Sequence, residues 1–89
     1  MRVAEEAHLL REAEASLRAG DTAGATRLLD DHARLFPHGV LAEERDLQRV
    51  LILCAASQVD AARAAASGFL SAYPQSVFAG RVRASCAGR

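Results

Sequence analysis

Apolar residues recur at intervals of three and four along most of the chain, which is the spacing of one face of an α-helix. The first such run begins at Val3 and ends before Gly20, a residue that suits the left-handed conformation just after a helix. Asp21 or Thr22 can cap a second helix by accepting from its free amides. This second helix ends before Pro37, because proline lacks an amide hydrogen and disfavours a helical residue before it.

Three more helices are predicted after the first proline. The third begins around Gly39 or Val40, and its last part, "VLILCAA" at 50–56, is apolar on all sides. A helix of this kind is covered on more than one side, so we expect it at the centre of the bundle. A fourth helix ends at Pro74, and Ser76 can cap a shorter fifth one. The pattern predicts an all-α domain of about five helices.

Composition favours the same fold and indicates what its core is made of. Twenty of the 89 residues are alanine and four are aromatic, so the helices must approach one another closely over small side chains. The second and fifth helices are expected to turn inward Ala25, Leu28, Leu29, His32, Leu35, Phe36, Val77, Phe78, Val82 and Cys86. All eleven basic residues are arginine, and lysine and asparagine, whose codons are AT-rich, are absent. We infer a high-GC bacterial genome.

Two stretches of similar sequence lie thirty-seven residues apart. They read "LFPHGVLAEER" from Leu35 and "AYPQSVFAGRV" from Ala72. At this offset the matched pairs include Phe36 with Tyr73, Pro37 with Pro74, Val40 with Val77, Leu41 with Phe78, and Ala42 with Ala79. A period in the thirties that is built from helix pairs is typical of α-solenoid repeats, in which one pair cannot bury its apolar face without its neighbour.

The two units "GDTAGATRLLDDHARLFPHG" and "SQVDAARAAASGFLSAYPQS" resemble the tetratricopeptide repeat. Ala25 and Ala62 stand at the small position where the two helices of a unit touch. The "YPQS" ending is similar to repeats of bacterial cell-envelope proteins such as outer-membrane assembly lipoproteins and Tol-Pal accessory proteins. The resemblance implies one domain over residues 1–89, with units at about 3–37 and 39–74 and a closing helix at about 76–87, in a right-handed superhelix. Leu9, Ala13 and Ser16 do not match the family's aromatic and glycine positions, so its peptide-clamp residues stay unassigned.

This resemblance implies a non-catalytic interaction or scaffold module that holds a protein or peptide partner in a preformed groove. We expect it to be the C-terminal domain of a larger bacterial protein. In such stacks the first helix of each unit lines the concave face. The predicted partner surface is therefore made by polar residues of the first and third helices, namely Arg11, Glu12, Arg45, Gln48 and Arg49.

Self-association is the alternative function. Residues 1–46 hold ten acids and six arginines, whereas residues 47–89 hold one acid and five arginines, so the halves carry about −4 and +4. Such a charge distribution favours an antiparallel homodimer. Its apolar contact surface would come either from Val77, Phe78 and Val82 or from Val3 and Leu10.

The two cysteines lie late in the third and the fifth helix, which are parallel neighbours in a solenoid. By the repeat offset, Cys86 corresponds to Arg49, five residues before Cys54, which is an axial gap of about 7.5 Å. A disulfide needs Cα atoms within about 7 Å, so a small change of register would permit one. The alternatives are a disulfide that fixes the last helix and two buried thiols. A thiol-based redox switch is a third reading, disfavoured because Cys-x-x-Cys spacing is absent.

The sequence offers no pattern that indicates catalysis, a metal or a cofactor. His8, His32 and His38 lack ligand spacing, and we interpret His32, on an apolar stripe, as a satisfied core side chain. The acid pairs Glu5-Glu6, Asp30-Asp31 and Glu43-Glu44 are interpreted as solvated or as placed at helix ends, where they complement the helix dipole. No serine lies in a nucleophile motif, and no phosphate-binding glycine loop occurs.

Nucleic acids and membranes are not expected partners. Only Arg81, Arg83 and Arg89 approach a basic cluster, and no apolar run reaches the roughly 18 residues of a membrane span. The first ten residues carry acids where a signal peptide has basic residues and then an apolar stretch. Localisation stays open: periplasmic or attached to the cell envelope if an anchor precedes this segment, and cytoplasmic otherwise.

Overall fold

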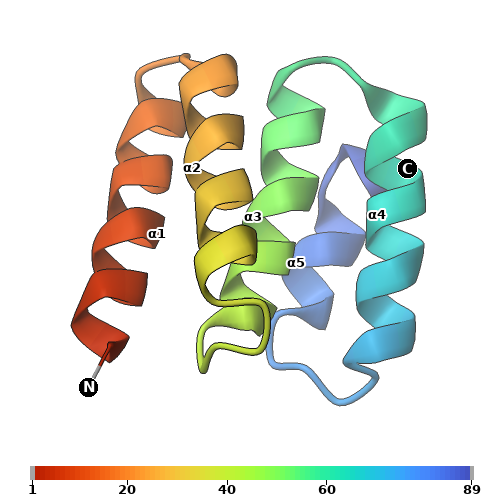
Figure 1. Ribbon diagram of the computed structural model, residues 1–89. Coiled ribbons are helices and arrows are strands. Elements are labelled where there is room, and N and C mark those ends of the chain that lie inside the picture. The colour runs from red at the N-terminus through yellow and green to blue at the C-terminus, as the bar shows by residue number, and fades with distance from the viewer. Residues whose placement is uncertain (1, 89) are drawn as a thin grey trace.

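Five α-helices and one turn of 3-10 helix make up residues 2–88, the part of the chain that this computed structural model describes (Figure 1). In chain order they are α1 Val3–Arg18, α2 Thr22–Leu35, α3 Ala42–Ala55, α4 Val59–Ala72, α5 Ala79–Ala84 and η1 Cys86–Gly88. No strand occurs among the described residues, so the all-α prediction with about five helices is confirmed.

The helices form a slab with α3 at its centre. Within residues 2–88, α3 contacts every other helix, whereas α2 and α4 do not contact each other. α1, α3 and α5 make one layer, and α2 and α4 cover it from the other side. The slab measures 38 × 29 × 18 Å, and its shortest side is about two helix diameters. The apolar sequence of α3 is explained by this position, because neighbours cover it on several sides.

The core consists of two clusters of buried side chains, and α3 contributes to both. One contains Leu10, Ala13, Ala25, Leu29 and Ile52, and the other contains Leu47, Val50, Ala66, Phe69 and Val82. Alanines at the helix crossings are almost fully buried, so backbones approach closely there. Each helix pair therefore has its own core, and α3 joins the two cores.

The repeat of thirty-seven residues is present in the backbone. α4 begins and ends thirty-seven residues after α2, and α5 begins thirty-seven residues after α3. The residues that end α2 and α4 have nearly the same dihedral angles, φ −135° and ψ 60° at Phe36 and φ −130° and ψ 65° at Tyr73. The first turn of each unit repeats as well, since Gly20 (φ 80°) is matched by Ser57 (φ 60°) in the left-handed region. The side chain of Asp21 caps α2 through the amide of Gly24, at 2.8 Å.

Several predicted details are wrong. α3 begins at Ala42 instead of at Gly39 or Val40. α5 ends at Ala84 because Ser85 is extended (ψ 177°), so the last turn reverses direction before η1. The side chains of Leu35 and Val77, expected in the core, are 42% and 87% exposed. Leu35 is the last residue of α2 and Val77 lies in the turn before α5, so both stand where the helical period no longer decides which side chain is buried.

A glutamate from the first helix of each unit reaches the turn that follows the second helix. Glu6 in α1 accepts hydrogen bonds from the amides of Val40 (3.3 Å) and Leu41 (3.4 Å), just before α3. Thirty-seven residues later, Glu43 accepts a bond from the hydroxyl of Ser76 at 2.6 Å. The backbone amides of Val40 and Leu41, which precede the first residue of α3, thus find their hydrogen-bond acceptor in a side chain of α1.

Gly39 is required by this contact. A Cβ atom at position 39 would overlap the Glu6 carboxylate, so any larger residue displaces the carboxylate from the two amides. The φ angle at Gly39 is ordinary, which means that close approach, and not a left-handed backbone, explains the glycine. Gly68 in α4 is the opposite case, because nothing lies within 4 Å of its Cβ position.

We predict opposite effects for the two substitutions. Gly39→Ala should lower the free energy of unfolding by about 1–3 kcal/mol, the usual cost of overfilling a packed site. Gly68→Ala should raise it by roughly 0.5–1 kcal/mol, since alanine is favoured inside a helix and meets no neighbour. Urea denaturation followed by circular dichroism measures both. Equal effects of the two substitutions would contradict a specific contact at Gly39.

Candidate functional site

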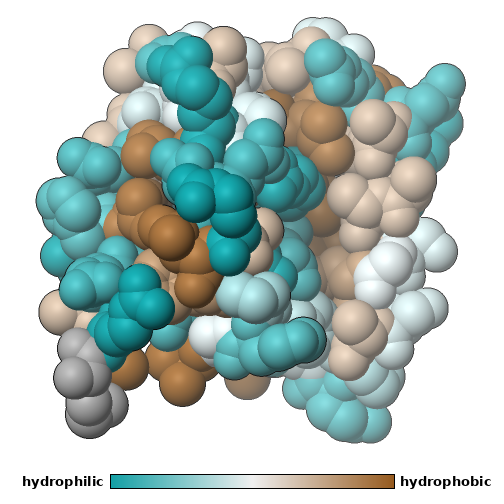
Figure 2. Space-filling model, viewed as in Figure 1, coloured by the Kyte–Doolittle hydropathy of each residue, from teal (hydrophilic) through white to brown (hydrophobic). Residues whose placement is uncertain are grey.

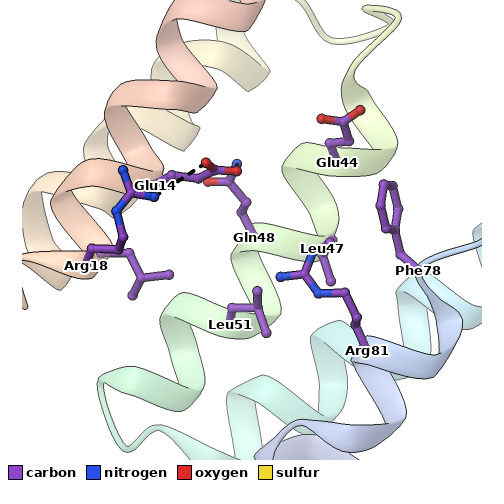
Figure 3. Close-up of a pocket in the computed structure, with 9 residues that line it drawn as sticks. Glu14, Arg18, Glu44, Leu47, Gln48, Leu51, Phe78 and Arg81 are labelled. Carbon is purple, nitrogen blue, oxygen red and sulfur yellow. Dashed lines mark hydrogen bonds and ion pairs between the residues drawn. The ribbon is translucent and has the colours of Figure 1, made fainter.

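An open groove runs between α1, α3 and α5 and has a volume of about 290 Å³ (Figure 3). Its floor comes from α3, one wall from α1, and the other wall from α5 and the residue before it. The lining residues are Glu14, Leu17, Arg18, Glu44, Leu47, Gln48, Leu51, Phe78 and Arg81. Ligand pockets for small molecules span about 300–1,000 Å³. The groove is at the lower limit of this range, a size that suits one or two side chains of a larger partner.

Gln48 is the polar residue at the floor of the groove. The residue is 5% exposed, and its Nε2 donates to the carbonyl of Leu10 (3.4 Å) and to Glu14 (3.5 Å). Both of these partners are acceptors, so they fix the orientation of the amide and point its nitrogen toward α1. The Oε1 atom of Gln48 is buried and has no hydrogen-bond partner among the described residues.

Charged side chains line the groove above this amide. Glu14 and Arg18 of α1 form an ion pair at 3.7 Å. Glu44 and Arg81, on α3 and α5, are exposed and have no polar partner within residues 2–88. In Figure 3 the guanidinium of Arg81 extends from α5 across α3 toward the middle of the groove. Two acids and two arginines therefore surround an apolar interior.

The five residues of the predicted partner surface do not form one surface in the structure. Arg11 and Glu12 are exposed on α1 and do not line the groove, and Arg49 forms an ion pair with Asp30 at 2.9 Å. Two residues of the predicted surface are mostly buried: the side chain of Arg45 is 11% exposed, and Gln48 is 5% exposed. Both belong to α3, and because α3 is covered on several sides, its polar side chains are turned toward neighbouring helices. Only Gln48 also lines the groove.

Sequence reasoning missed the residues that form the walls. Phe78 is predicted to face inward or to belong to a dimer surface, and Arg81 to belong to a sparse basic cluster, whereas the structure places both in the wall of the groove. The repeat offset could have indicated Arg81, because Arg81 corresponds to Glu44 and both residues line the same groove. Glu14 and Arg18, four residues apart on one helix, are a second signal for an exposed polar face.

A second hollow of about 410 Å³ lies on the outer side of α1 and α2, beside Ala4, Leu9, Leu35 and Phe36. It has a larger volume than the groove, yet it lacks a buried polar atom that would fix the orientation of a ligand. Specific sites combine an apolar lining with a few placed polar groups. We therefore regard the groove as the candidate functional site.

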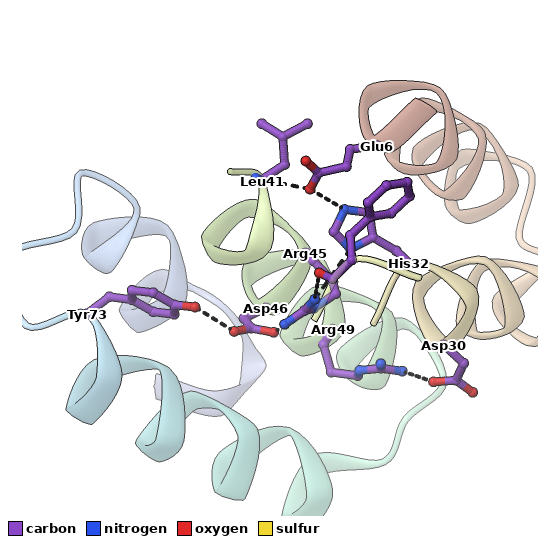
Figure 4. Close-up of polar contacts among 9 residues, drawn as sticks. Glu6, Asp30, His32, Leu41, Arg45, Asp46, Arg49 and Tyr73 are labelled. Carbon is purple, nitrogen blue, oxygen red and sulfur yellow. Dashed lines mark hydrogen bonds and ion pairs between the residues drawn. The ribbon is translucent and has the colours of Figure 1, made fainter. Parts of the chain in front are cut away.

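A buried polar cluster joins four helices on the other side of α3 (Figure 4). His32 of α2 is fully buried, and its Nε2 lies 3.1 Å from Oε1 of Glu6, which is also buried. Its Nδ1 lies 3.4 Å from the guanidinium of Arg45. The interpretation of Glu5-Glu6 as a solvated pair is therefore wrong for Glu6. Its carboxylate is buried and lies within hydrogen-bond distance of the His32 ring and of the amides of Val40 and Leu41.

The partners of His32 determine its tautomer. An arginine can only donate, so Nδ1 accepts from Arg45 and Nε2 carries the proton that is donated to Glu6. Burial, followed by the positive charge of Arg45, lowers the pKa of His32 below its ordinary value, and the nearby Glu6 only partly opposes this. His32 is thus held neutral, with both nitrogens engaged and no contact with solvent, in a structural role.

The cluster continues to α4. Arg45 contacts Asp46 at 3.1 Å and the carbonyl of Phe36 at 3.3 Å, and the Tyr73 hydroxyl donates to Asp46 at 2.9 Å. Burial, and next the hydrogen bond to Asp46, raises the pKa of Tyr73. The aromatic residue that ends α4 is therefore tied to the start of α3, and the same start of α3 is tied to α1 and α2.

Cys54 and Cys86 are joined by a disulfide, with their Cα atoms 5.6 Å apart. Because Ser85 is extended, Cys86 does not continue the helix of α5. Its position therefore differs from the one that the repeat offset predicts, and it lies close enough to Cys54 for the bond. The bond holds η1 against α3 and α4 and thereby fixes the segment that follows α5.

The large exposed apolar side chains gather at one end of the bundle. They are Val3, Leu35, Val40 and Val77, and this end contains the start of α1 and the α2–α3 and α4–α5 turns (Figure 1). Figure 2 shows hydrophobic side chains along the same lower edge. Leu10 and Val82, predicted for a dimer surface, are buried at 4% and 1% exposure and are unavailable. The predicted dimer surfaces are wrong for these two residues, because both face the core.

Within residues 2–88 no group of three or more histidine, cysteine or acidic side chains is placed to hold a metal ion. None of the described helices is long and apolar enough to cross a membrane. No protein-family model matches the sequence, and comparisons with curated proteins and with solved structures find no match either. The candidate site is therefore defined by its geometry alone.

We predict that acidification destabilises the domain through His32. The folded pKa of His32 is lowered, so below the ordinary value of about 6.5 the unfolded chain binds a proton that the folded chain does not. The contribution of His32 should therefore be fully present above that pH and be lost as the pH falls below about 6.5, by up to about 1.4 kcal/mol per pH unit. Urea denaturation at each pH gives this slope.

The matched variants are His32→Gln and His8→Gln. His8 lies on the exposed face of α1, outside the buried cluster of Glu6 and Arg45, and so serves as the control, whereas His32→Gln should flatten the slope. An unchanged slope in His32→Gln would refute the assignment.

We predict that loss of the disulfide lowers the free energy of unfolding by about 3–4 kcal/mol. The bond joins cysteines thirty-two residues apart, and a loop of this length restricts the unfolded chain by about that amount. Dithiothreitol should lower the urea midpoint of the wild type. It should leave the midpoint of a Cys54→Ala/Cys86→Ala variant unchanged, and this midpoint should equal that of the reduced wild type. If dithiothreitol also lowered the midpoint of the double variant, its effect on the wild type could not be assigned to the Cys54–Cys86 bond.

Proposed function

We propose that this domain is a non-catalytic protein-interaction module that binds a peptide segment of a partner protein in the groove of α1, α3 and α5. The observation that carries this proposal is the open groove of about 290 Å³ itself, in which half-buried Leu17, Leu51 and Phe78 lie beside the exposed charges of Glu44 and Arg81. The repeated helix pairs, with their resemblance to tetratricopeptide units, support the same role.

The way the walls are fixed supports binding without a large change of shape. α1 is tied by Glu6 to α2 and to the α2–α3 turn, and the segment after α5 is tied by the disulfide to α3. A preformed groove reduces the entropy that a partner and its site lose on binding. A disulfide in so small a domain also favours an oxidising compartment such as the periplasm.

The test is a selection of peptides from a displayed library of random twelve-residue sequences against the wild-type domain. We expect enriched peptides that bind with micromolar affinity and that shift the NMR signals of groove residues such as Leu17 and Leu51. Leu51→Arg places a charge inside the groove and should weaken binding at least tenfold. Ala64→Arg places the same charge on the exposed face of α4 and should leave binding unchanged.

Two results would overturn the proposal. One is the absence of any enriched peptide. The other is a set of peptides that binds Leu51→Arg as tightly as the wild type, since their site would then lie elsewhere.

A further inference from the structure

We propose that the outer face of α1 binds an amphipathic helix of a second protein, placed on α1 as α2 is placed on α3. The docking helix carries a basic side chain that meets Glu12 and an aromatic side chain that enters the hollow beside Leu35 and Phe36. This surface lies apart from the groove, so the inference does not depend on the proposed function. Three observations support it.

The first observation is that the same chain shows what covers the equivalent face of α3. At the offset of thirty-seven residues, three residues of α1 correspond to three of α3, namely His8 to Arg45, Glu12 to Arg49, and Ala15 to Ile52. On α3, Arg45 lies 3.4 Å from the ring of His32, and Arg49 pairs with Asp30 at 2.9 Å. Ile52 is packed in the core cluster that includes two residues of α2. A helix in the position of α2 is therefore the cover that this face receives within the repeat.

The corresponding positions of α1 face solvent. The side chain of His8 is 63% exposed, whereas that of Arg45 is 11% exposed. Ala15 is exposed, whereas Ile52 is buried. α1 lies at one end of the slab and contacts α2 and α3 on its inner side (Figure 1). The two faces thus have equivalent positions in the repeat, and only the face of α3 is covered.

The second observation is the hollow of about 410 Å³ beside this face. Its lining is mainly apolar and consists of Ala4, Glu5, His8, Leu9, Leu35 and Phe36. In the second unit, the last turn of α2 lies at the corresponding place, where Arg45 contacts His32 and the carbonyl of Phe36. A large aromatic side chain in a pocket is a common anchor of an interface. An aromatic residue in the last turn of the docking helix fits the hollow in the same way.

The third observation is the charge at the centre of the face. α3 presents Arg49 to Asp30 of α2, whereas α1 presents Glu12 at the same position of the repeat. A helix that docks on α1 in the same geometry must carry a basic residue where α2 has Asp30, because an acid there would be repelled by Glu12. In a second copy this position is Asp30 in α2 and Ser67 in α4, and neither is basic. Charge complementarity therefore favours a different protein over a second copy.

The probe is a synthetic peptide that copies residues 21–38 of this chain, which are α2 and its two ends, and carries Asp30→Arg. Because an isolated helix this short is only marginally stable in water, we expect submillimolar affinity and follow binding by NMR of the labelled domain. The signals of Ala4 and Ala15 should shift, and those of Leu51 in the groove should not. The unaltered peptide should bind about fivefold more weakly, since its Asp30 would face Glu12.

The domain variants are Glu12→Arg and the matched control Glu44→Arg. Glu12→Arg should reverse the preference, so that the unaltered peptide binds about fivefold more tightly than the Asp30→Arg peptide. Glu44 is an exposed acid that lines the groove, so Glu44→Arg should keep the preference of the wild type. Phe36→Ala in the peptide should weaken binding to the wild type about tenfold, because it removes the aromatic anchor. Circular dichroism and the urea midpoint check the fold of each domain variant.

Four outcomes would overturn the inference. One is the absence of binding at millimolar peptide. Another is a set of shifts centred on Leu51, or on Ile52, since the peptide would then occupy the groove or replace α2 in its own unit. A third is an unchanged charge preference in Glu12→Arg. The fourth is a wild-type dimer in analytical ultracentrifugation that Glu12→Arg dissociates, which would assign the face to a second copy. All of these outcomes leave the proposed function in place, because it is tested with peptides that bind in the groove.

Discussion

The buried contact between Glu6 and His32 is the interaction on which the first half of the structure depends. A carboxylate removed from water is costly unless donors replace its hydration, and three donors surround Glu6: His32 and the amides of Val40 and Leu41. These donors come from α2 and from the turn before α3. A single side chain thereby fixes the position of α1 relative to the next two helices, and α1 is one wall of the groove.

The elements of the fold could be predicted from the sequence because they follow from local chemistry. The helical period, the two prolines and Gly20 determine where the helices run and where most of them end, and the apolar "VLILCAA" indicates the central helix. The start of α3 and the end of α5 could not be predicted in this way. Contacts between distant residues accompany both, the Glu6 carboxylate before α3 and the Cys54–Cys86 bond after α5.

The candidate site was predictable only in outline. The resemblance indicated the first helix of each unit as the lining, and α1, α3 and α5 do line the groove. The individual residues differ, because the polarity of a side chain does not reveal which face of a covered helix it occupies. Arg45 and Gln48 are polar and yet buried, since His32, Glu14 and two backbone carbonyls provide partners for them. Such pairing depends on the packing of helices far apart in the sequence.

The two units solve the same structural problem with different chemistry. His32 of the first unit corresponds to Phe69 of the second, so the second unit has an apolar ring at the position where the first has the buried imidazole that binds Glu6. Glu43 binds the hydroxyl of Ser76, and the second unit is closed by the disulfide. The α1 wall of the groove is therefore held by a proton-sensitive contact and the α5 side by a reducible bond. Because Gln48 lies between these walls, the shape of the groove around it depends on both kinds of bond at once.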